Sequence, residues 1–302
     1  MKRCSNLPQN MVAFTSRWGM CSVTMLQERQ SMEFTRMRKA IGSCSKGFAA
    51  PSRRPDCELA IPSIAKEGGK IGDMRKEKFG VGTLVHVVNR GAHKMPIVRD
   101  EADRWRFLKL LRYLNDMNVP QHWERDITPQ YIRDNFARPD TWPAAKPFVS
   151  ILSHHLADNH FHLLVRENVE GGIAAFMHRA SRSMAAHYNA KYQSSGALFQ
   201  GSYRARIVND DTYLQYLSVY INIKNPFELF PGGLDVAVKN FDQAYEFAIK
   251  YTFSSTSDFA GKRESSIIDT KLRKELFQSP QDFRESAKDL MTSRQDFLDF
   301  EL

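Results

Sequence analysis

Two histidines stand one residue apart in the segment "LADNHFHLLVREN", residues 156–168, whose other residues are typical of a buried strand. In a β-strand, residues i and i+2 point to the same side and lie roughly 6.5 to 7 Å apart. His160 and His162 could therefore direct two imidazoles at one metal ion, although such pairs also occur on ordinary solvated faces. Phe161, Leu163 and Val165 make one face of this strand apolar, so the histidines occupy the other face.

Two neutral imidazoles are too few to hold Mg²⁺ or Mn²⁺ firmly. A third protein ligand and oxygen atoms of a substrate phosphate would complete such a site. The segment "TYLQYLSVYINIKNPFEL", residues 212–229, offers candidates for the third ligand. His154 and His155 precede the pair along the chain, and we interpret both as surface or hydrogen-bonded core histidines rather than ligands.

The elements that must position these residues follow from hydrophobic periodicity and from turn residues. Apolar residues recur with a helical period in the segment "RDEADRWRFLKLLRYLNDM", which has acids in its first turn. Asp210 or Asp211 is a good N-cap for a later helix, and Pro226 should stop that helix. The predicted strands lie at 81–90, 148–155 and 160–166, and the predicted helices at 99–117, 172–193, 210–224, 234–250 and 270–302. The order strand, helix, strand, strand, helix predicts an α+β fold with an antiparallel sheet.

The distribution of charge favours a polyanionic partner. The chain of 302 residues has a net charge of +9 and a pI near 9.4. No Asp or Glu occurs from residue 171 to 208, where basic residues alternate with aromatic residues. Basic groups suit phosphates and rings suit unstacked bases, so this segment is typical of a single-stranded nucleic acid site. The alternative is a helix with a solvated basic face and an aromatic stripe in the core.

The first part of the chain differs from the rest. Residues 1–73 lack sustained periodicity and end in the segment "KEGGKIGD", so we interpret them as a disordered extension or as residues before a true start at Met74. All four cysteines lie within the first 57 residues, at spacings that match no metal knuckle, which makes a reducing compartment the default. Peptides from residues 1–60 in the mass spectrum of the native protein would exclude a start at Met74.

No membrane partner is expected. The apolar runs at residues 148–152 and 161–165 are far shorter than the roughly 20 residues that a membrane helix requires. Cytoplasmic localisation is the expectation, in line with a reducing compartment.

Four segments in order resemble the single-tyrosine HUH transposases, and most closely the REP-associated tyrosine transposases. They are "HVVNRGAHKMPIVRDEADRWRFLKLL", "LADNHFHLLV", "YNAKYQSSGALFQGSYRA" and "YLQYLSVYINIKNP". The resemblance covers about residues 80–260 and implies a ferredoxin-like α+β core in a catalytic domain over residues 74–260, followed by a charged helical tail over 261–302. It also implies Mg²⁺- or Mn²⁺-dependent cleavage and joining of single-stranded DNA next to a hairpin, through a 5′-phosphotyrosine intermediate.

The resemblance assigns roles to individual residues. His160 and His162 match the family's metal-binding pair, Asn159 matches the asparagine that commonly precedes it, and Tyr220 matches the nucleophilic tyrosine. The alternative for Tyr220 is a core aromatic, because it shares helical spacing with Tyr213 and Tyr216.

One departure from the family pattern concerns the third metal ligand. The family commonly has Asn four residues after the tyrosine, but this chain has Lys224 there and Asn225 next. On an ideal helix Lys224 lies about 40° from Tyr220 and Asn225 about 140° away, and a protonated lysine cannot bind a metal. Either a π-bulge or an early helix end brings Asn225 round, or the site uses another ligand, or metal binding is weakened.

The segment "LFQGSYRAR" resembles the family's "LFQGRFKA", which implies DNA contacts. The predicted DNA-binding residues are Arg90, Arg179, Arg182, Lys191, Gln200, Arg204 and Arg206. For each arginine the alternative is a surface salt bridge.

Three function classes remain open. The first is a metal-dependent single-strand nuclease and strand transferase, monomeric or homodimeric. The second is a domesticated nucleic-acid-binding regulator that has lost catalysis, which the altered "NIKNP" segment favours. The third is a hydrolase of a small phosphorylated substrate, which leaves the basic and aromatic segment unexplained.

Overall fold

The computed structural model describes residues 79–293, and the predictions for residues 1–73, including the four cysteines, lie outside them. Within this part of the chain, four strands form one sheet in the order β2-β3-β1-β4. Every neighbouring pair is antiparallel. The strands are β1 (Leu84–Arg90), β2 (Val149–Leu156), β3 (His160–Glu167) and β4 (Arg204–Val208).

The connectivity confirms the ferredoxin-like α+β fold. A long helix follows β1, a hairpin joins β2 to β3, and another long helix leads from β3 to β4. This βαββαβ order, with β1 and β3 at the centre of the sheet, is the ferredoxin-like arrangement. Strand β4 had no counterpart in the secondary-structure prediction from periodicity. It is a five-residue edge strand in which exposed Arg204 and Arg206 alternate with half-buried residues.

The helices that follow the strands match most of the predicted positions. The predicted helix over 234–250 is divided in two at Asn240. In place of one helix from residue 270, two helices cover most of residues 270–292, and the remainder of the region predicted over 270–302 lies outside the described residues. The longer helices are α2 (Glu101–Lys109), extended by a π-helix at Leu110–Leu114, α5 (Gly172–Tyr192), α6 (Asp211–Val219), α8 (Gly233–Lys239), α9 (Phe241–Lys250), α11 (Thr270–Leu276) and α12 (Pro280–Thr292). The shorter ones are α3 (Trp123–Asp126), α4 (Pro129–Arg133), α7 (Asn225–Glu228), α10 (Thr256–Phe259), a 3₁₀ turn at Ala92–Lys94 and a π-helix at Tyr220–Lys224.

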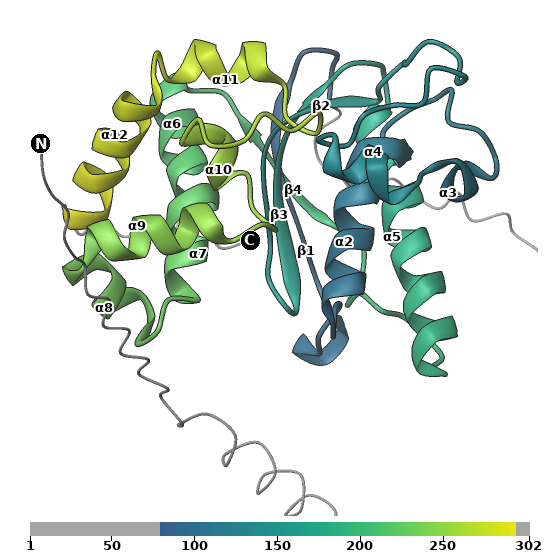
Figure 1. Cartoon of the computed structure of the whole chain (residues 1–302), viewed down its shortest axis with the longest axis horizontal. Helices are drawn as coiled ribbons and strands as arrows, with labels where there is room; N and C mark the ends of the chain where they lie inside the picture. Colours follow the sequence, from purple (N-terminus) through teal and green to yellow (C-terminus); the bar gives the residue numbers. More distant parts are fainter. Residues whose placement is uncertain (1–78, 294–302) are drawn as a thin grey trace, which may run out of the picture. The chain divides into compact units, whose positions relative to one another are not determined.

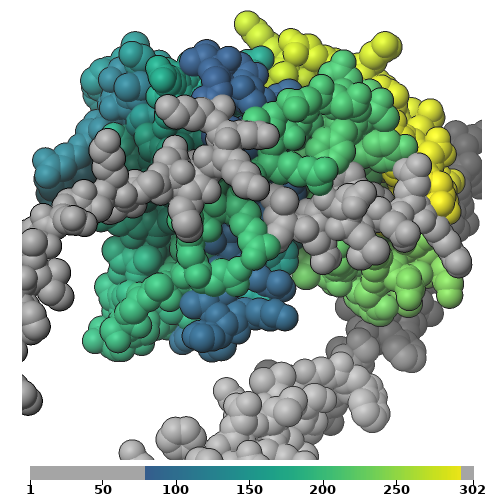
Figure 2. All heavy atoms as spheres, turned by 180° about the vertical axis from the view of Figure 1, so that it is seen from behind, coloured from purple at the N-terminus to yellow at the C-terminus, as the bar shows by residue number. Residues whose placement is uncertain are grey.

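Helices cover both faces of the sheet. Helices α2 and α5 pack on one face, and the helices from α6 to α12 lie on the other (Figure 1). Figure 2 shows the same arrangement from behind, with the earlier helices in blue and teal and the C-terminal helices in green and yellow. Leu272 of α11, Phe283 of α12 and Phe277, which lies between the two helices, belong to the same buried cluster as Tyr220. The C-terminal helices therefore help to hold the layer that carries the tyrosine.

Alternation along β3 determines which layer the histidines meet. Phe161, Leu163 and Val165 are buried in the cluster formed with α2 and α5, whereas Leu164 is buried in the cluster formed with α6 to α9. Since successive strand residues point to opposite faces, His160 and His162 face the α6 layer. The predicted separation of an apolar face from a histidine face is confirmed.

Helix α6 begins where the sequence predicted. The Asp210 side chain accepts a hydrogen bond from the backbone N–H of Tyr213 at 2.7 Å, which caps the first turn. None of the helices in residues 79–293 is long and apolar enough to cross a membrane.

Candidate active site

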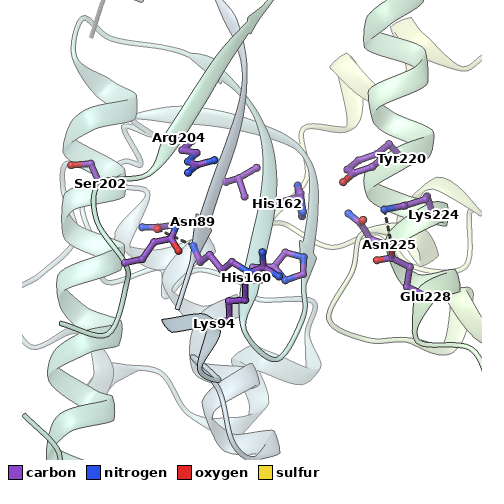
Figure 3. Close-up of a pocket in the computed structure, with 13 residues that line it drawn as sticks. Asn89, Lys94, His160, His162, Ser202, Arg204, Tyr220, Lys224, Asn225 and Glu228 are labelled. Carbon is purple, nitrogen blue, oxygen red and sulfur yellow. Dashed lines mark hydrogen bonds and ion pairs between the residues drawn. The ribbon is translucent and has the colours of Figure 1, made fainter. Parts of the chain in front are cut away.

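A pocket of about 430 Å³ opens at the end of the sheet where β1 ends and β3 begins. It lies between the histidine face of the sheet and the turn that connects α6 to α7 (Figure 3). Its lining is almost entirely polar: Val88, Asn89, Arg90, Lys94, His160, His162, Gln200, Ser202, Arg204, Tyr220, Lys224, Asn225 and Glu228. Segments separated by more than a hundred residues therefore supply one site.

Both histidines of the predicted pair line this pocket. Their ring centroids are 5.1 Å apart, with the rings nearly perpendicular. His162 is only 4% exposed, whereas His160 is half-buried. Among residues 79–293, no group of three or more His, Cys, Asp or Glu side chains could hold a metal ion. A cation at this pair would therefore need an amide oxygen or substrate oxygens to complete its coordination.

Each histidine has a hydrogen-bond partner for its Nδ1 atom. His162 Nδ1 lies 3.0 Å from Nε2 of His86, a fully buried residue of β1 whose ring plane is nearly parallel to that of His162. His160 Nδ1 lies 2.7 Å from Oδ1 of Asn159. The periodicity of β1 had predicted no role for His86, and only the pairing of β1 with β3 brings it behind His162.

Burial keeps His86 and His162 neutral. It is the main cause that lowers the pKa of His86 to about 3, and the positive charge of Arg206 acts in the same direction. Burial also lowers the pKa of His162 well below its usual value, followed by the influence of His86 and His160. Neutral imidazoles retain a lone pair, which is the form that binds metals.

His154 and His155 are both fully buried, which agrees with one of the two environments expected for them. The expectation of hydrogen bonds to their rings is wrong, because neither ring nitrogen of either residue has a partner within the described residues. His155 lies opposite His162 in the β2–β3 pairing but does not line the pocket. Burial lowers the pKa of both histidines far enough to keep them uncharged, which allows them to remain without partners.

Tyr220 lies across the pocket from the histidines. Its side chain is 2% exposed, its ring centroid is 5.5 Å from that of His162, and its hydroxyl points into the pocket (Figure 3). Tyr220 therefore belongs to the core cluster and to the pocket at once, so burial in the core, expected from its helical spacing, does not remove it from the pocket.

A π-turn brings Asn225 to the same pocket. Residues Tyr220–Lys224 form a π-helix, and the backbone N–H of Asn225 donates to the carbonyl oxygen of Tyr220 five residues earlier. The extra residue of this segment is thus absorbed within the turn, which is the first of the alternatives considered for it. Asn225 lines the pocket, is 2% exposed and has no hydrogen-bond partner for its Nδ2 atom among residues 79–293. An unpaired buried amide nitrogen beside two imidazoles is suited to a ligand that this part of the chain does not supply.

The prediction that Pro226 stops the helix is wrong. Lys224 and Asn225 both have right-handed helical backbone angles, and α7 continues with Pro226 in its first turn. Proline has no N–H, so the carbonyl oxygen of Asn222 lacks its usual partner and accepts a hydrogen bond from Thr256 Oγ1.

The side chain of Asn222 holds this turn against the sheet. Its Nδ2 atom donates to Ser153 Oγ of β2 at 3.1 Å and to the carbonyl oxygen of Ser218 at 2.9 Å. Its Oδ1 atom accepts from Ser255 Oγ. Because Asn222 is fully buried, these bonds set the position of the π-turn relative to the histidine strand.

Lys224 lies beside the tyrosine rather than away from the site. Its Nζ atom is 4.9 Å from the centroid of the Tyr220 ring and 2.8 Å from Glu228 Oε1, one turn later on α7. Both residues line the pocket, so a positive charge lies next to the tyrosine and a carboxylate holds it there (Figure 3). The sequence analysis assigned no role to Glu228.

The predicted DNA-binding residues fall into two groups. Arg90, Gln200 and Arg204 line the pocket, and Arg182 lines an adjoining pocket of about 360 Å³ that shares Asn89 and Ser202 with it. Arg206 lies beside His86, and its guanidinium is 5.1 Å from the Tyr213 ring centroid.

Arg179 and Lys191 lie elsewhere, in contacts between elements. Arg179 donates to the carbonyl oxygen of Asp116 and lies over the Phe148 ring. Lys191 forms salt bridges with Asp100 and Asp103 of 2.6 and 2.8 Å. These contacts join α5 to the preceding helical segment.

Part of the chain matches a known protein family. Residues 144–224, which include β2, β3, α5, β4, α6 and the π-turn, match the model of a family described as IS200-like transposases. The chain is also similar to a solved structure described as the REP-associated tyrosine transposase bound to a REP hairpin. The two share 12% sequence identity with a TM-score of 0.34, and the match covers 66% of this chain and 94% of that chain. No curated protein matches the sequence.

Proposed function

We propose that this chain, whose residues 144–224 match the model of the IS200-like transposase family, cleaves and rejoins single-stranded DNA with Tyr220 as the nucleophile. The observation that carries this proposal is the convergence of Tyr220, His160, His162 and Asn225 on one pocket. A core aromatic without a catalytic role would not need to face two histidines and an unpaired amide.

His160, His162 and Asn225 would hold a divalent metal ion, Mg²⁺ or Mn²⁺, together with oxygen atoms of the substrate. The ion would polarise the scissile phosphate and offset the charge that develops on the leaving oxygen. Asn225 can present its Oδ1 atom by rotating its amide, since no hydrogen bond to Nδ2 opposes the rotation.

The reaction follows from the position of the tyrosine. The phenolic oxygen of Tyr220, having lost its proton, attacks the phosphorus, and the bond from phosphorus to the 3′ oxygen breaks. The 3′ oxygen leaves with a proton as a hydroxyl, and the phosphate remains on Tyr220 as a 5′-phosphotyrosine. The reverse attack by a 3′ hydroxyl rejoins a strand without external energy, because the phosphodiester energy is retained in the covalent bond.

The charged residues of the pocket suit a DNA substrate. Arg90 and Arg204 are exposed at the pocket and can contact the phosphates on either side of the cleaved bond. The resemblance of the sequence motifs supports a hairpin next to the cleavage position. Such an enzyme would act in the cytoplasm, where it would associate with the nucleoid.

The test uses a single-stranded hairpin oligonucleotide with Mg²⁺ or Mn²⁺. Wild-type protein should become linked to the 5′ end of the downstream fragment, and Tyr220→Phe should form no adduct. Tyr216→Phe, on the same helix but outside the pocket, is the matched control and should form the adduct normally. Recovery of unchanged adduct from Tyr220→Phe would exclude Tyr220 as the nucleophile.

The same experiment separates this proposal from a regulator without catalysis. A regulator would bind the hairpin with strong salt dependence and yield no adduct under any divalent metal. The altered "NIKNP" segment no longer favours that alternative, since the π-turn places Asn225 at the pocket.

A further inference from the structure

We propose that His86 and Asn159 are positioning residues that fix the imidazole tautomers of His162 and His160, so that both rings present Nε2 to one divalent cation. This inference rests on the proposed metal site and assigns a role to two residues that do not themselves touch the cation. Hydrogen bonds at the Nδ1 atoms of His160 and His162 support it.

The orientation of Asn159 determines the proton on His160. The Nδ2 atom of Asn159 donates to the carbonyl oxygen of Lys94 at 3.2 Å, so Oδ1 is the atom that faces His160 at 2.7 Å. An amide oxygen can only accept, and therefore Nδ1 of His160 must carry the hydrogen. The lone pair of the neutral ring then resides on Nε2, the nitrogen that Asn159 does not engage.

The pair formed by His86 and His162 shares one hydrogen. Since two neutral imidazoles at 3.0 Å need one donor and one acceptor, either Nδ1 of His162 donates to His86 or Nε2 of His86 donates to His162. Only the first arrangement leaves a lone pair on Nε2 of His162, which is the nitrogen left to reach the pocket. The ring planes are 16° apart and the centroids 5.2 Å apart, so the two rings lie nearly edge to edge in one plane, which directs Nε2 of His86 at Nδ1 of His162.

The environment of His86 is consistent with a positioning role. His86 is fully buried, and its Nδ1 atom has no hydrogen-bond partner within the described residues. A polar side chain that leaves one nitrogen unpaired in the core destabilises the fold, and a leucine at this position would avoid that loss. The presence of His86 is explained if its other nitrogen orients a metal ligand, because hydrogen-bond partners of metal-binding histidines generally have this effect.

The first measurement determines the tautomers directly. In ¹⁵N-histidine NMR spectra of the metal-free protein, recorded well above the ordinary histidine pKa of about 6.5, His160 and His162 should carry hydrogen on Nδ1. Asn159→Ala should shift His160 toward the other tautomer, and His86→Leu should do the same for His162. Hydrogen on Nε2 of both ligand histidines in the wild-type protein would overturn the inference.

The second measurement is Mn²⁺ affinity by calorimetry, without DNA. Asn159→Ala and His86→Leu should each weaken binding about 10- to 100-fold. Asn159→Asp and His86→Gln keep an acceptor oxygen and should recover most of the affinity. Exposed His122→Leu is the control for loss of a histidine and should bind as the wild type does. Unchanged affinity in a folded Asn159→Ala would overturn the inference.

Half-buried Asn159 provides this test even if a substitution at the core residue His86 impairs folding. Both measurements are independent of strand cleavage. If the predicted tautomers and Mn²⁺ binding are observed but no DNA adduct forms, the proposed function is contradicted and this inference stands. If the adduct forms but the tautomers do not change in the variants, this inference is contradicted and the proposed function stands.

Discussion

The backbone N–H of Asn225 donates to the carbonyl oxygen of Tyr220, and this single wide turn directs both side chains at one pocket. An ordinary α-helical turn would have placed Lys224 above Tyr220 and moved Asn225 to another face. Here Lys224 still lies next to the tyrosine ring, and Asn225 reaches the pocket as well. The extra residue before Pro226 therefore adds a cation to the site without removing the amide.

Replacement of Asn225 should weaken metal binding and cleavage together. Asn225→Ala removes the proposed third ligand, and we expect a loss of Mn²⁺ affinity of at least about tenfold, since even partners behind ligands contribute that much. Asn225→Asp retains an oxygen at the same place and should bind the ion at least as well as the wild type. Calorimetry and adduct yield measure both effects. Wild-type affinity in Asn225→Ala would show that another group is the third ligand.

Replacement of Asn222 should destabilise the π-turn. Asn222→Ala removes three side-chain hydrogen bonds in the core, and we expect the free energy of unfolding to fall by about 2 to 4 kcal/mol. Asn240→Ala is the matched control, because its amide is exposed and donates to the carbonyl oxygen of Val236 in the adjacent helix α8. Asn240→Ala should lower the free energy of unfolding, measured in urea, by less than about 1 kcal/mol. Similar losses in the two variants would mean that Asn222 does not hold the turn.

Lys224 and Glu228 should act as a coupled pair toward the substrate. Lys224→Met leaves the Glu228 carboxylate uncompensated at a pocket that receives phosphate, so we expect the KM for the hairpin to rise most in this variant. The KM of the double variant Lys224→Met/Glu228→Gln should lie between those of the wild type and Lys224→Met. Glu228→Gln alone should change the KM least. The interaction should exceed about 0.5 kcal/mol in the double-mutant cycle. Strictly additive effects would contradict a coupled pair.

Arg204 and Lys191 should respond differently to salt. Arg204 lines the pocket, so Arg204→Gln should weaken hairpin binding and reduce the salt slope of the logarithm of the binding constant by about 0.7 to 1. Lys191→Gln should leave both quantities unchanged and lower the free energy of unfolding, because buried Asp103 loses a partner. A reduced salt slope in Lys191→Gln would instead place the end of α5 on the path of the DNA.

His154 should make the fold sensitive to acid. Burial holds its pKa in the folded protein well below 6.5, whereas the unfolded chain has the ordinary value, so the unfolded state binds the extra proton as the pH falls. The stability lost through this residue should reach about 1.4 kcal/mol one pH unit below 6.5. His154→Leu should therefore gain stability relative to the wild type between pH 7.5 and 5.5, as measured by chemical denaturation. A constant difference across that range would show that His154 is not kept neutral by the fold.

Much of the fold was predictable because its signals are local. The two long helices over the sheet have a clear apolar period, and the β2–β3 hairpin has two dense apolar strands with a turn between them. Strand β4 escaped detection because Arg204 and Arg206 interrupt a segment of only five residues, and its pairing with β1 is what makes it a strand. The short helix α10 had no counterpart among the predicted helices for a similar reason, since its position depends on hydrogen bonds of Ser255 and Thr256 with distant His154 and Asn222.

The features of the candidate site also fall into those that local sequence patterns predict and those that depend on tertiary contacts. The sequence by itself determined the two histidines on one strand face, the tyrosine on a helix and the basic character of the neighbouring segment, because strand and helix periods and charge are properties of adjacent residues. Only the tertiary structure decided that Asn225 reaches the pocket and that His86 lies behind His162. The same holds for the contact of Glu228 with Lys224 beside the tyrosine. It also holds for the salt bridges that join Lys191 of α5 to Asp100 and Asp103. The π-turn depends on Ser153, Ser255 and Thr256, and the His86 contact on the pairing of strands 76 residues apart. Such hydrogen bonds form only after the chain has folded, so no local pattern in the sequence could have predicted them.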